Sequence, residues 1–212
     1  MTRALLLAAA AATALSLSAC NQRNEGNTAA ADSSAMNTAA APGQSGPVNA
    51  AQDAMGAAVG ATSAATVGAR DTDAFVQNAV ESNMYEIEAA KIAQEKASSA
   101  DVKAFAKTMI TDHTAMMNEM KPVITKAGKT APTELDQRRK GLLDNLRAAG
   151  ANDFDKTYLD QQVAAHEETL TLLNGYAENG DNADLKAAAS KAAPKVQAHL
   201  DKAKSLQAKA GA

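Results

Sequence analysis

Three histidines in this 212-residue chain have the surroundings expected of metal ligands. They are His113, His166 and His199, and each lies on the apolar stripe of a different predicted helix. Around His113, large apolar residues recur at alternating steps of three and four, and the imidazole occupies one place in that series. Imidazole nitrogens bind zinc, iron and copper. Three such rings at one level would therefore form a site for one transition-metal ion.

The rise of an α-helix places the histidines at similar depths. At about 1.5 Å per residue, His113 lies about 22 Å from the turn before its helix. His166 and His199 lie about 20 and 25 Å from the turn between theirs. Glu86, on the apolar face of the first long helix, lies about 19 Å from its own turn. With both turns at one end, these side chains converge, which predicts Glu86, His113, His166 and His199 as metal ligands.

Neighbouring side chains extend this hypothesis. Asp112 and Gln162 are placed to hold the imidazoles as outer hydrogen-bond partners, although a flanking Asp112 also fits a solvated position. Met109 and Met116 flank His113, and their thioethers would suit Cu(I). Packing as ordinary core residues is the better explanation of both methionines.

A structural role for the histidines is the alternative. An imidazole buried without a partner costs on the order of 1–3 kcal/mol, so three of them require partners of some kind. Polar neighbours could supply hydrogen bonds without any metal: Glu86, Asp112, Gln162, Tyr158 and Asn83. The protein would then be a non-catalytic envelope or stress-related protein. An enzyme is the weakest hypothesis, because no nucleophile is spaced with a base and no glycine-rich phosphate loop is present.

Amphipathic segments separated by turn signals predict the elements that position these residues. Ser98 to Asp101 and Asn179 to Asn182 read as tight turns between antiparallel helices, whereas Pro122 and Pro194 predict kinks. The fold class is therefore all-α: a ferritin-like four-helix bundle over residues 71–209 with a short crossover helix. The predicted helices are residues 71–97, 101–127, 133–149, 153–178 and 183–208.

Composition supports a helical core of small residues and excludes one class of partner. Hydrophobic residues make up 46% of the chain, but only 3% is aromatic and there is no Trp, so much of the core must be Ala. The formal charge is −3, with both signs interspersed. Nucleic-acid binding is not expected, because no basic face is present.

The first residues resemble a bacterial export signal. Residues 1–19 contain one Arg and an apolar run too short to span a bilayer, which is typical of a signal peptide. Leu17 to Cys20 resembles a lipobox, which implies that Cys20 is lipidated and that the protein contacts a membrane through this lipid. Asn21 after the cysteine favours the outer membrane, facing the periplasm. Plain secretion with an incidental cysteine is the alternative. The sequence does not identify a protein partner.

Residues 20–70 are predicted to be a disordered tether. Ala, Gly, Ser, Thr, Asn, Gln and Pro dominate, with few large apolar residues and no helical period. Such a segment buries too little surface to offset its chain entropy. As a flexible coil of about fifty residues it would reach roughly 40 Å.

Between residues 71 and 206 the chain also matches the pattern of a known family, at Phe75-Val76, Glu86-Ile87-Glu88, Val102-Lys103, Phe105-Ala106, Met109, Asp112-His113, Phe154-Asp155, Tyr158, His166 and His199-Leu200. These residues resemble domain-of-unknown-function family 4142, ferritin-like exported proteins often labelled outer-membrane proteins. The resemblance implies a bundle fold and export, and no established activity.

A di-iron centre is not expected despite the ferritin-like fold. Such centres require Glu-x-x-His on two helices. In this chain the residues three positions before the histidines are Ile110, Val163 and Val196. One mononuclear zinc, iron or copper site is therefore the most that these residues support.

Overall fold

A computed structural model of the chain describes residues 46–210. The predicted signal peptide, Cys20 and the first part of the predicted tether lie outside the described residues. Among residues 46–210, no helix combines the length and apolar composition needed to cross a bilayer. The helices are α1 (Gly46–Ala65), α2 (Thr72–Lys96), α3 (Ala100–Lys126), α4 (Gln137–Ala148), α5 (Phe154–Asn179) and α6 (Ala183–Ala210).

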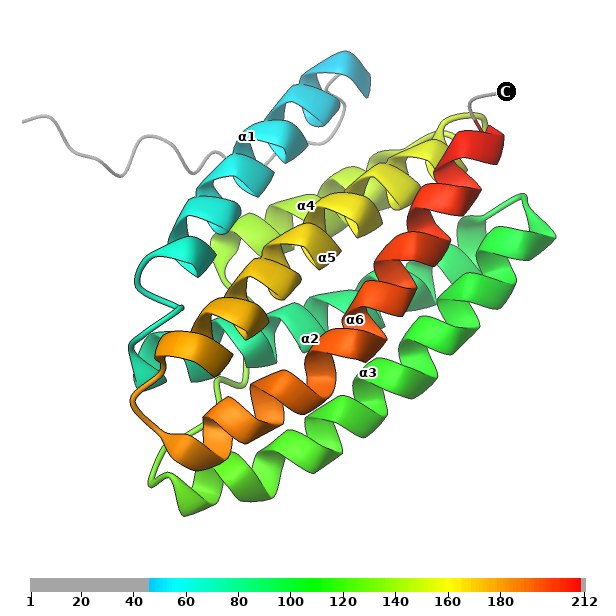
Figure 1. The fold of residues 1–212 in the computed structure, drawn as a ribbon. Helices are drawn as coiled ribbons and strands as arrows, with labels where there is room; N and C mark the ends of the chain where they lie inside the picture. Colours follow the sequence, from blue (N-terminus) through cyan, green and yellow to red (C-terminus); the bar gives the residue numbers. More distant parts are fainter. Residues whose placement is uncertain (1–45, 211–212) are drawn as a thin grey trace, which may run out of the picture. The chain divides into compact units, whose positions relative to one another are not determined.

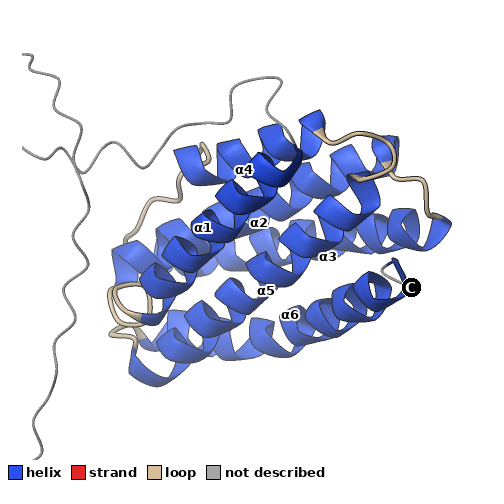
Figure 2. Cartoon of the chain, turned by 90° about the horizontal axis from the view of Figure 1, so that it is seen from above, coloured by secondary structure: helices blue, strands red, loops and turns tan. Residues whose placement is uncertain are grey.

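Two antiparallel helix pairs form the bundle (Figure 1). α2 pairs with α3, and α5 pairs with α6. The pairs meet where α2 packs on α5 and α3 packs on α6, while the short helix α4 crosses from one pair to the other and lies over α2 and α5. The view from above in Figure 2 shows α1 and α4 beside α5, outside the four long helices. The predicted all-α bundle with a crossover helix is confirmed.

Side-chain caps define where the bundle helices begin. Asp71 accepts a hydrogen bond from Ala74 N at the start of α2, and Asp136 caps α4 in the same way. The cap of α3 is Ser99, one residue later than the predicted capping box. The carboxylate of Asp155 also accepts hydrogen bonds from the backbone of this turn, which ties it to the start of α5.

The two internal prolines do not end their helices. α3 continues through Pro122 to Lys126, and α6 continues through Pro194 to Ala210. Each proline removes one backbone donor, and tertiary packing on both sides keeps the helix continuous. Val196, two residues after Pro194, is buried in the core.

A layer of polar side chains divides the core into two apolar clusters. One cluster lies toward the α5–α6 turn and includes Phe75, Ile124 and Leu185. The other lies toward the α2–α3 turn and includes Phe105 and Leu206. Along each long helix the two sets are separated by the polar residues between them: Asn83 and Glu86 on α2, His113 on α3, Gln162 and His166 on α5, and His199 on α6.

Helix α1 corrects one boundary of the predicted tether. Residues 46–65 are helical, although residues 20–70 were predicted to be disordered. The composition explains both results: alanine favours a helix, but only Ala64 of α1 joins the apolar core. Polar contacts hold the helix instead, because Asp53 accepts hydrogen bonds from Asn145 of α4 and Gln161 of α5, each at 2.6 Å.

A buried ion-pair network joins α4 to the bundle. Glu81 lies on the face of α2 opposite its apolar stripe, yet it is 4% exposed and its carboxylate lies 2.9 Å from the guanidinium of Arg139. Glu168 accepts from both Arg138 and Arg139. This face of α2 is buried because α4 covers it. Glu95 of α2 is exposed.

Gly60 of α1 provides a test of this arrangement. A Cβ atom there would overlap the carboxylate of Glu168 and lie 2.8 Å from Arg138 Nη1. Since Glu168 is held by two arginines, it cannot move without breaking an ion pair. Gly60→Ala should therefore destabilise the protein by about 1–3 kcal/mol, despite the helix propensity of alanine.

Gly141 of α4 is the matched control, because a Cβ atom at this helical position meets nothing within 4 Å. Gly141→Ala should be neutral or stabilising by up to about 1 kcal/mol. Chemical unfolding of both variants checks the prediction. Equal stability of the two alanine variants would show that α1 does not pack closely on Glu168.

Candidate metal centre

The three histidines meet in the polar layer at the centre of the bundle. Their ring centroids are 5.7 Å apart for His113 and His166, 5.3 Å for His113 and His199, and 5.6 Å for His166 and His199. All three side chains are buried, with 1–5% of their surface exposed. The rings from α3, α5 and α6 therefore meet at one level, as predicted. The assumption that both turns lie at one end is wrong, because the α2–α3 turn and the α5–α6 turn lie at opposite ends of the bundle. The rings still meet because each histidine lies near the middle of its helix.

One nitrogen of each ring faces an oxygen acceptor. His113 Nδ1 lies 2.9 Å from Asn83 Oδ1, and the Asn83 amide nitrogen donates to Ala79 O, so its oxygen must face the ring. His166 Nδ1 lies 2.8 Å from the backbone oxygen of Gln162. His199 Nε2 lies 2.9 Å from Asp112 Oδ2. Because these atoms accept hydrogen bonds, each facing ring nitrogen carries the proton.

The hydrogen bonds leave one lone pair free on each ring. His113 Nε2, His166 Nε2 and His199 Nδ1 are buried and have no hydrogen-bond partner. One ligand nitrogen from each of the three histidines lies within 4.8 Å of the other two. Nitrogens bound to a common ion at about 2.0–2.1 Å would be about 3.4 Å apart in tetrahedral geometry. Modest rotation of the side chains covers that difference, so the residues fit one metal ion.

Protonation of these rings is opposed by the fold. Burial lowers the pKa of His166 to about 4, against the hydrogen bond to Gln162. Burial also lowers the pKa of His113 well below its ordinary value, and the neighbouring histidines lower it further. The pKa of His199 is lowered by burial, although Asp112 acts in the opposite direction. All three rings are therefore neutral at pH 7, which is the form that binds metals.

Glu86 lies on the outer side of His166. Its Oε1 is 3.6 Å from His166 Nδ1, the nitrogen bonded to the backbone of Gln162, and its Oε2 accepts a hydrogen bond from Gln162 Nε2 at 2.7 Å. Burial raises the pKa of Glu86 to about 8, against the hydrogen bond from Gln162. The cluster of potential ligands within the described residues contains the histidines without Glu86. Its assignment as a fourth ligand stays a prediction.

Asp112 and Gln162 contact the rings, as an outer layer of partners would. Asp112 marks the side nearest to solvent, because its side chain is 22% exposed and its other oxygen lies 3.1 Å from Lys195 Nζ. Burial tends to raise the pKa of Asp112, but the hydrogen bonds from His199 and Lys195 outweigh it and the pKa is lowered. Asp112 is therefore an ionised acceptor for His199.

Two other expectations for the centre have different outcomes. Tyr158 was a candidate hydrogen-bond partner, but its hydroxyl is buried without a partner. Met109 and Met116 are both buried, and each belongs to a different apolar cluster. Packing in the core thus accounts for these two methionines. No sequence signal distinguished Asn83, which holds His113, from the other polar neighbours.

The family comparison covers most of this architecture. The sequence profile described as domain of unknown function (DUF4142) matches residues 57–206. The chain belongs to this family. The matched segment begins within α1 and contains the polar layer with all three histidines. A search of curated proteins found no match.

Solved structures with a similar fold include two of the protein CopM. The Cu(II)-bound form has a TM-score of 0.56 and 18% sequence identity, over 66% of this chain and 97% of that one. The Ag-bound form has a TM-score of 0.53 and 19% identity, over 64% of this chain and 93% of that one. At this level of identity the comparison establishes a shared fold for the DUF4142 domain.

Glu86 should make the stability of the metal-free protein depend on pH. Its carboxyl group keeps its proton up to about pH 8 when folded, against an ordinary value of 4.5. The folded state therefore binds more protons, and stability falls as pH rises across this range. Below an ordinary histidine pKa of 6.5, the depressed pKa of His166 acts in the opposite direction, because protonation then favours unfolding. Between pH 6.5 and 8, the titration of Glu86 should lower the free energy of unfolding by about 1–2 kcal/mol.

Urea unfolding of chelator-treated protein at the two pH values measures this loss. Glu86→Gln should remove it, because the amide oxygen still accepts from Gln162 and carries no titrating proton. Glu95→Gln, on the exposed side of α2, controls for the loss of one acidic residue. If the Glu86 variant keeps the wild-type pH slope, the buried carboxyl is not the titrating group.

Proposed function

We propose that the protein binds a single transition-metal ion through His113, His166 and His199, with copper as the physiological metal. The free ring nitrogens, His113 Nε2, His166 Nε2 and His199 Nδ1, would be the ligating atoms. Asn83, Gln162 and Asp112 would hold the rings in the required tautomers and orientations. The ion, when bound, would supply a Lewis-acidic centre that completes the polar layer. Glu86 is a proposed fourth ligand.

The observation that carries this proposal is the position of the unpartnered polar atoms. Nine buried side-chain nitrogen and oxygen atoms lack a partner within the described part of the chain, and three of them are ring nitrogens of this centre: His113 Nε2, His166 Nε2 and His199 Nδ1. Two more, Glu86 Oε1 and Gln162 Oε1, belong to residues that contact His166. Each such atom costs about 1–3 kcal/mol.

A purely structural role for the histidines explains the hydrogen bond of only one of the two nitrogens in each ring. A polar network that served stability alone would be expected to pair both nitrogens of each ring. Here the acceptors satisfy one nitrogen per ring and leave the other facing its neighbours. A metal ion would satisfy all three remaining lone pairs at once.

The ligand chemistry favours copper over zinc or iron. Imidazole accepts all three metals, and Cu²⁺ has the highest affinity of the divalent ions for such a site. Monovalent Cu(I) also suits a neutral ligand set, because the cost of burying an ion rises steeply with its charge. CopM, which shares the fold, has been solved with Cu(II) and with Ag bound. That likeness supports a copper-type ion in the proposed site.

Metal binding by the full-length protein tests the proposal. Equilibrium competition against chromophoric chelators for Cu(I), Cu(II), Zn²⁺ and Fe²⁺ should give one ion per chain, with copper bound most tightly. Copper at about 100 times its dissociation constant should also raise the free energy of unfolding by about 2.7 kcal/mol. If none of the four metals binds stoichiometrically or shifts unfolding, the centre is structural.

Replacement of ligands identifies the site. His113→Ala, in protein that remains folded by circular dichroism, should weaken copper binding by at least about tenfold, since one of three ligands is lost. Met109→Leu is the matched control, because it changes a fully buried side chain one turn earlier on the same face of α3. It should leave copper affinity unchanged within about twofold. Unchanged affinity in the histidine variant would exclude His113 as a ligand.

We also propose that the protein is a lipoprotein of the outer membrane that faces the periplasm, anchored by lipid on Cys20. The support is the sequence of residues 1–20, with its short apolar run and lipobox-like end. Cys20→Ser should abolish incorporation of labelled fatty acid and move the protein from the membrane to the soluble fraction. Labelling that persists in this variant would contradict the anchor.

A further inference from the structure

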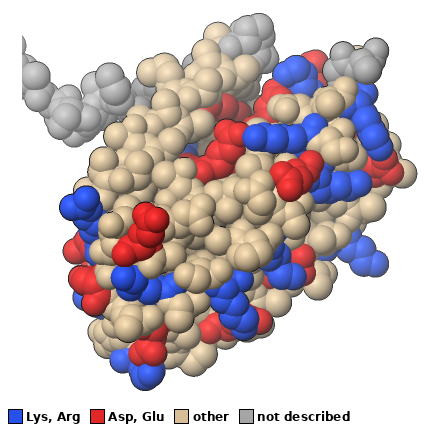
Figure 3. Space-filling model, viewed as in Figure 1, with Lys and Arg blue, Asp and Glu red and all other residues tan. Residues whose placement is uncertain are grey.

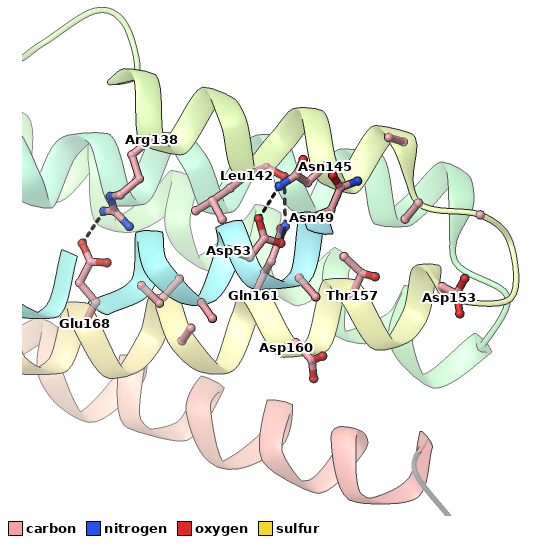
Figure 4. A pocket seen from close by; sticks show the side chains of 18 residues that line it. Asn49, Asp53, Arg138, Leu142, Asn145, Asp153, Thr157, Asp160, Gln161 and Glu168 are labelled. Atoms are coloured by element: carbon pink, nitrogen blue, oxygen red, sulfur yellow. Dashed lines mark hydrogen bonds and ion pairs between the residues drawn. The ribbon is translucent and has the colours of Figure 1, made fainter. Parts of the chain in front are cut away.

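A second polar feature lies outside the metal centre, in a pocket of about 490 Å³ between α1, α4 and α5. Figure 4 shows Asp53 of α1 at its middle, next to Asn49 and Asn145, with Glu168 at one end and Asp153 at the other. Alanines from all three helices form much of its wall. The volume is typical of a site for a small molecule.

The pocket has an excess of negative charge. Four carboxylates line it, from Asp53, Asp153, Asp160 and Glu168, and one guanidinium, from Arg138. Glu168 pairs with Arg138 and Asp160 pairs with Lys156, which leaves Asp53 and Asp153 without a cationic partner among the described residues. Asp53 accepts two amide hydrogen bonds, and no Lys or Arg of the described chain pairs with it. Burial raises the pKa of Asp53, which reflects a charge that no cation compensates. In Figure 3, acidic groups gather beside the uncharged surface of α1.

Free acceptors beside Asp53 point independently to a ligand. Asn145 is 3% exposed and lines the pocket, yet its Oδ1 has no partner. Its amide nitrogen donates to the Asp53 carboxylate, so the oxygen is the atom left over. Asn49, one helical turn before Asp53, also lines the pocket and has an unpartnered Oδ1. Gln52 Oε1, also on α1, is unpartnered as well.

The arrangement selects the class of cation. Within the described residues, the three histidines are the one group of three or more such side chains close enough together to hold a metal ion, so no three of the pocket carboxylates form such a group. No aromatic side chain lines the pocket, which disfavours quaternary ammonium groups held by cation–π contacts. An alkylammonium group offers three N–H donors, and the Asp53 carboxylate, Asn145 Oδ1 and Asn49 Oδ1 offer three acceptors. The alanine wall suits an aliphatic chain.

We propose that this pocket binds an aliphatic primary ammonium group, with its N–H donors directed to Asp53, Asn145 and Asn49. Free alkylamines and lysine side chains share this chemistry. Binding would give Asp53 a counter-charge and satisfy both buried amide oxygens. The pocket is lined by residues other than the three histidines, so this activity is independent of metal binding.

Calorimetric titration of the full-length, chelator-treated protein tests the inference. The probes are n-butylammonium and Nα-acetyl-lysine methylamide, with n-butanol and tetramethylammonium as matched non-binders. We expect at least one primary ammonium probe to bind at one site and the two controls not to bind. Preference for butylammonium would indicate a free amine as the ligand, and preference for the lysine derivative would indicate a polypeptide side chain.

Two variants with the same net charge separate a built site from general attraction. Asp53→Asn should weaken binding by at least about tenfold, because a charge-assisted hydrogen bond is lost. Asp144→Asn, on α4 outside the pocket, should retain wild-type affinity within about twofold. Ala164→Leu fills the pocket without removing any hydrogen bond, and it should also abolish binding if α1 stays docked. Absence of binding by both ammonium probes, or equal affinity in the Asp53 and Asp144 variants, would overturn the inference.

Discussion

Hydrogen bonds from imidazole rings to oxygen acceptors on neighbouring helices constrain how the bundle helices align. His113 bonds to Asn83 on α2, and His199 bonds to Asp112 on α3, while His166 bonds within α5. These polar groups lie between two apolar clusters. A shift of one helix by a turn would move a ring into hydrocarbon and leave another acceptor unpaired, at about 1–3 kcal/mol for each lost partner. The polar layer therefore sets the register of the helices, whereas the apolar clusters supply most of the attraction between them.

Periodicity predicted the parts of the fold that are buried along a single stripe. The long helices follow that rule, because every residue of a stripe such as Phe105, Met109 and His113 faces one core. Helix α1 and Glu81 do not follow it. α1 has no apolar stripe and is held by polar contacts from Asp53, which periodicity cannot reveal. Glu81 lies on the opposite face of α2 from the main stripe, and only the position of the crossover helix shows that this face is buried as well.

The sequence likewise predicted one part of the candidate site and missed another. Residue type and helical periodicity were enough to predict that the three histidines meet, because each lies on an apolar stripe near the middle of its helix. The assumed placement of both turns at one end was wrong, but a position at mid-helix gives the same level whichever end carries the turn. The choice of ring nitrogen depends on side-chain rotamers and on nearby acceptors, which have no sequence signature. The same limit applies to Asn83, whose amide oxygen faces His113 only because its nitrogen bonds to its own helix. The pocket beside α1 could not be predicted at all, since it requires a helix that the composition did not indicate.

The docking of α1 has a mechanical consequence. Any pull on the chain before residue 46 reaches α1 before it reaches the bundle, because α1 directly precedes α2. α1 places one alanine in the core and is otherwise held by a few polar contacts, so it needs less work to detach than a bundle helix with many buried side chains. Under tension α1 would therefore detach before the bundle helices, and the histidine layer would keep its geometry. Re-docking after release would then require Asp53 to re-form its hydrogen bonds with Asn145 and Gln161 and Gly60 to pack again on Glu168.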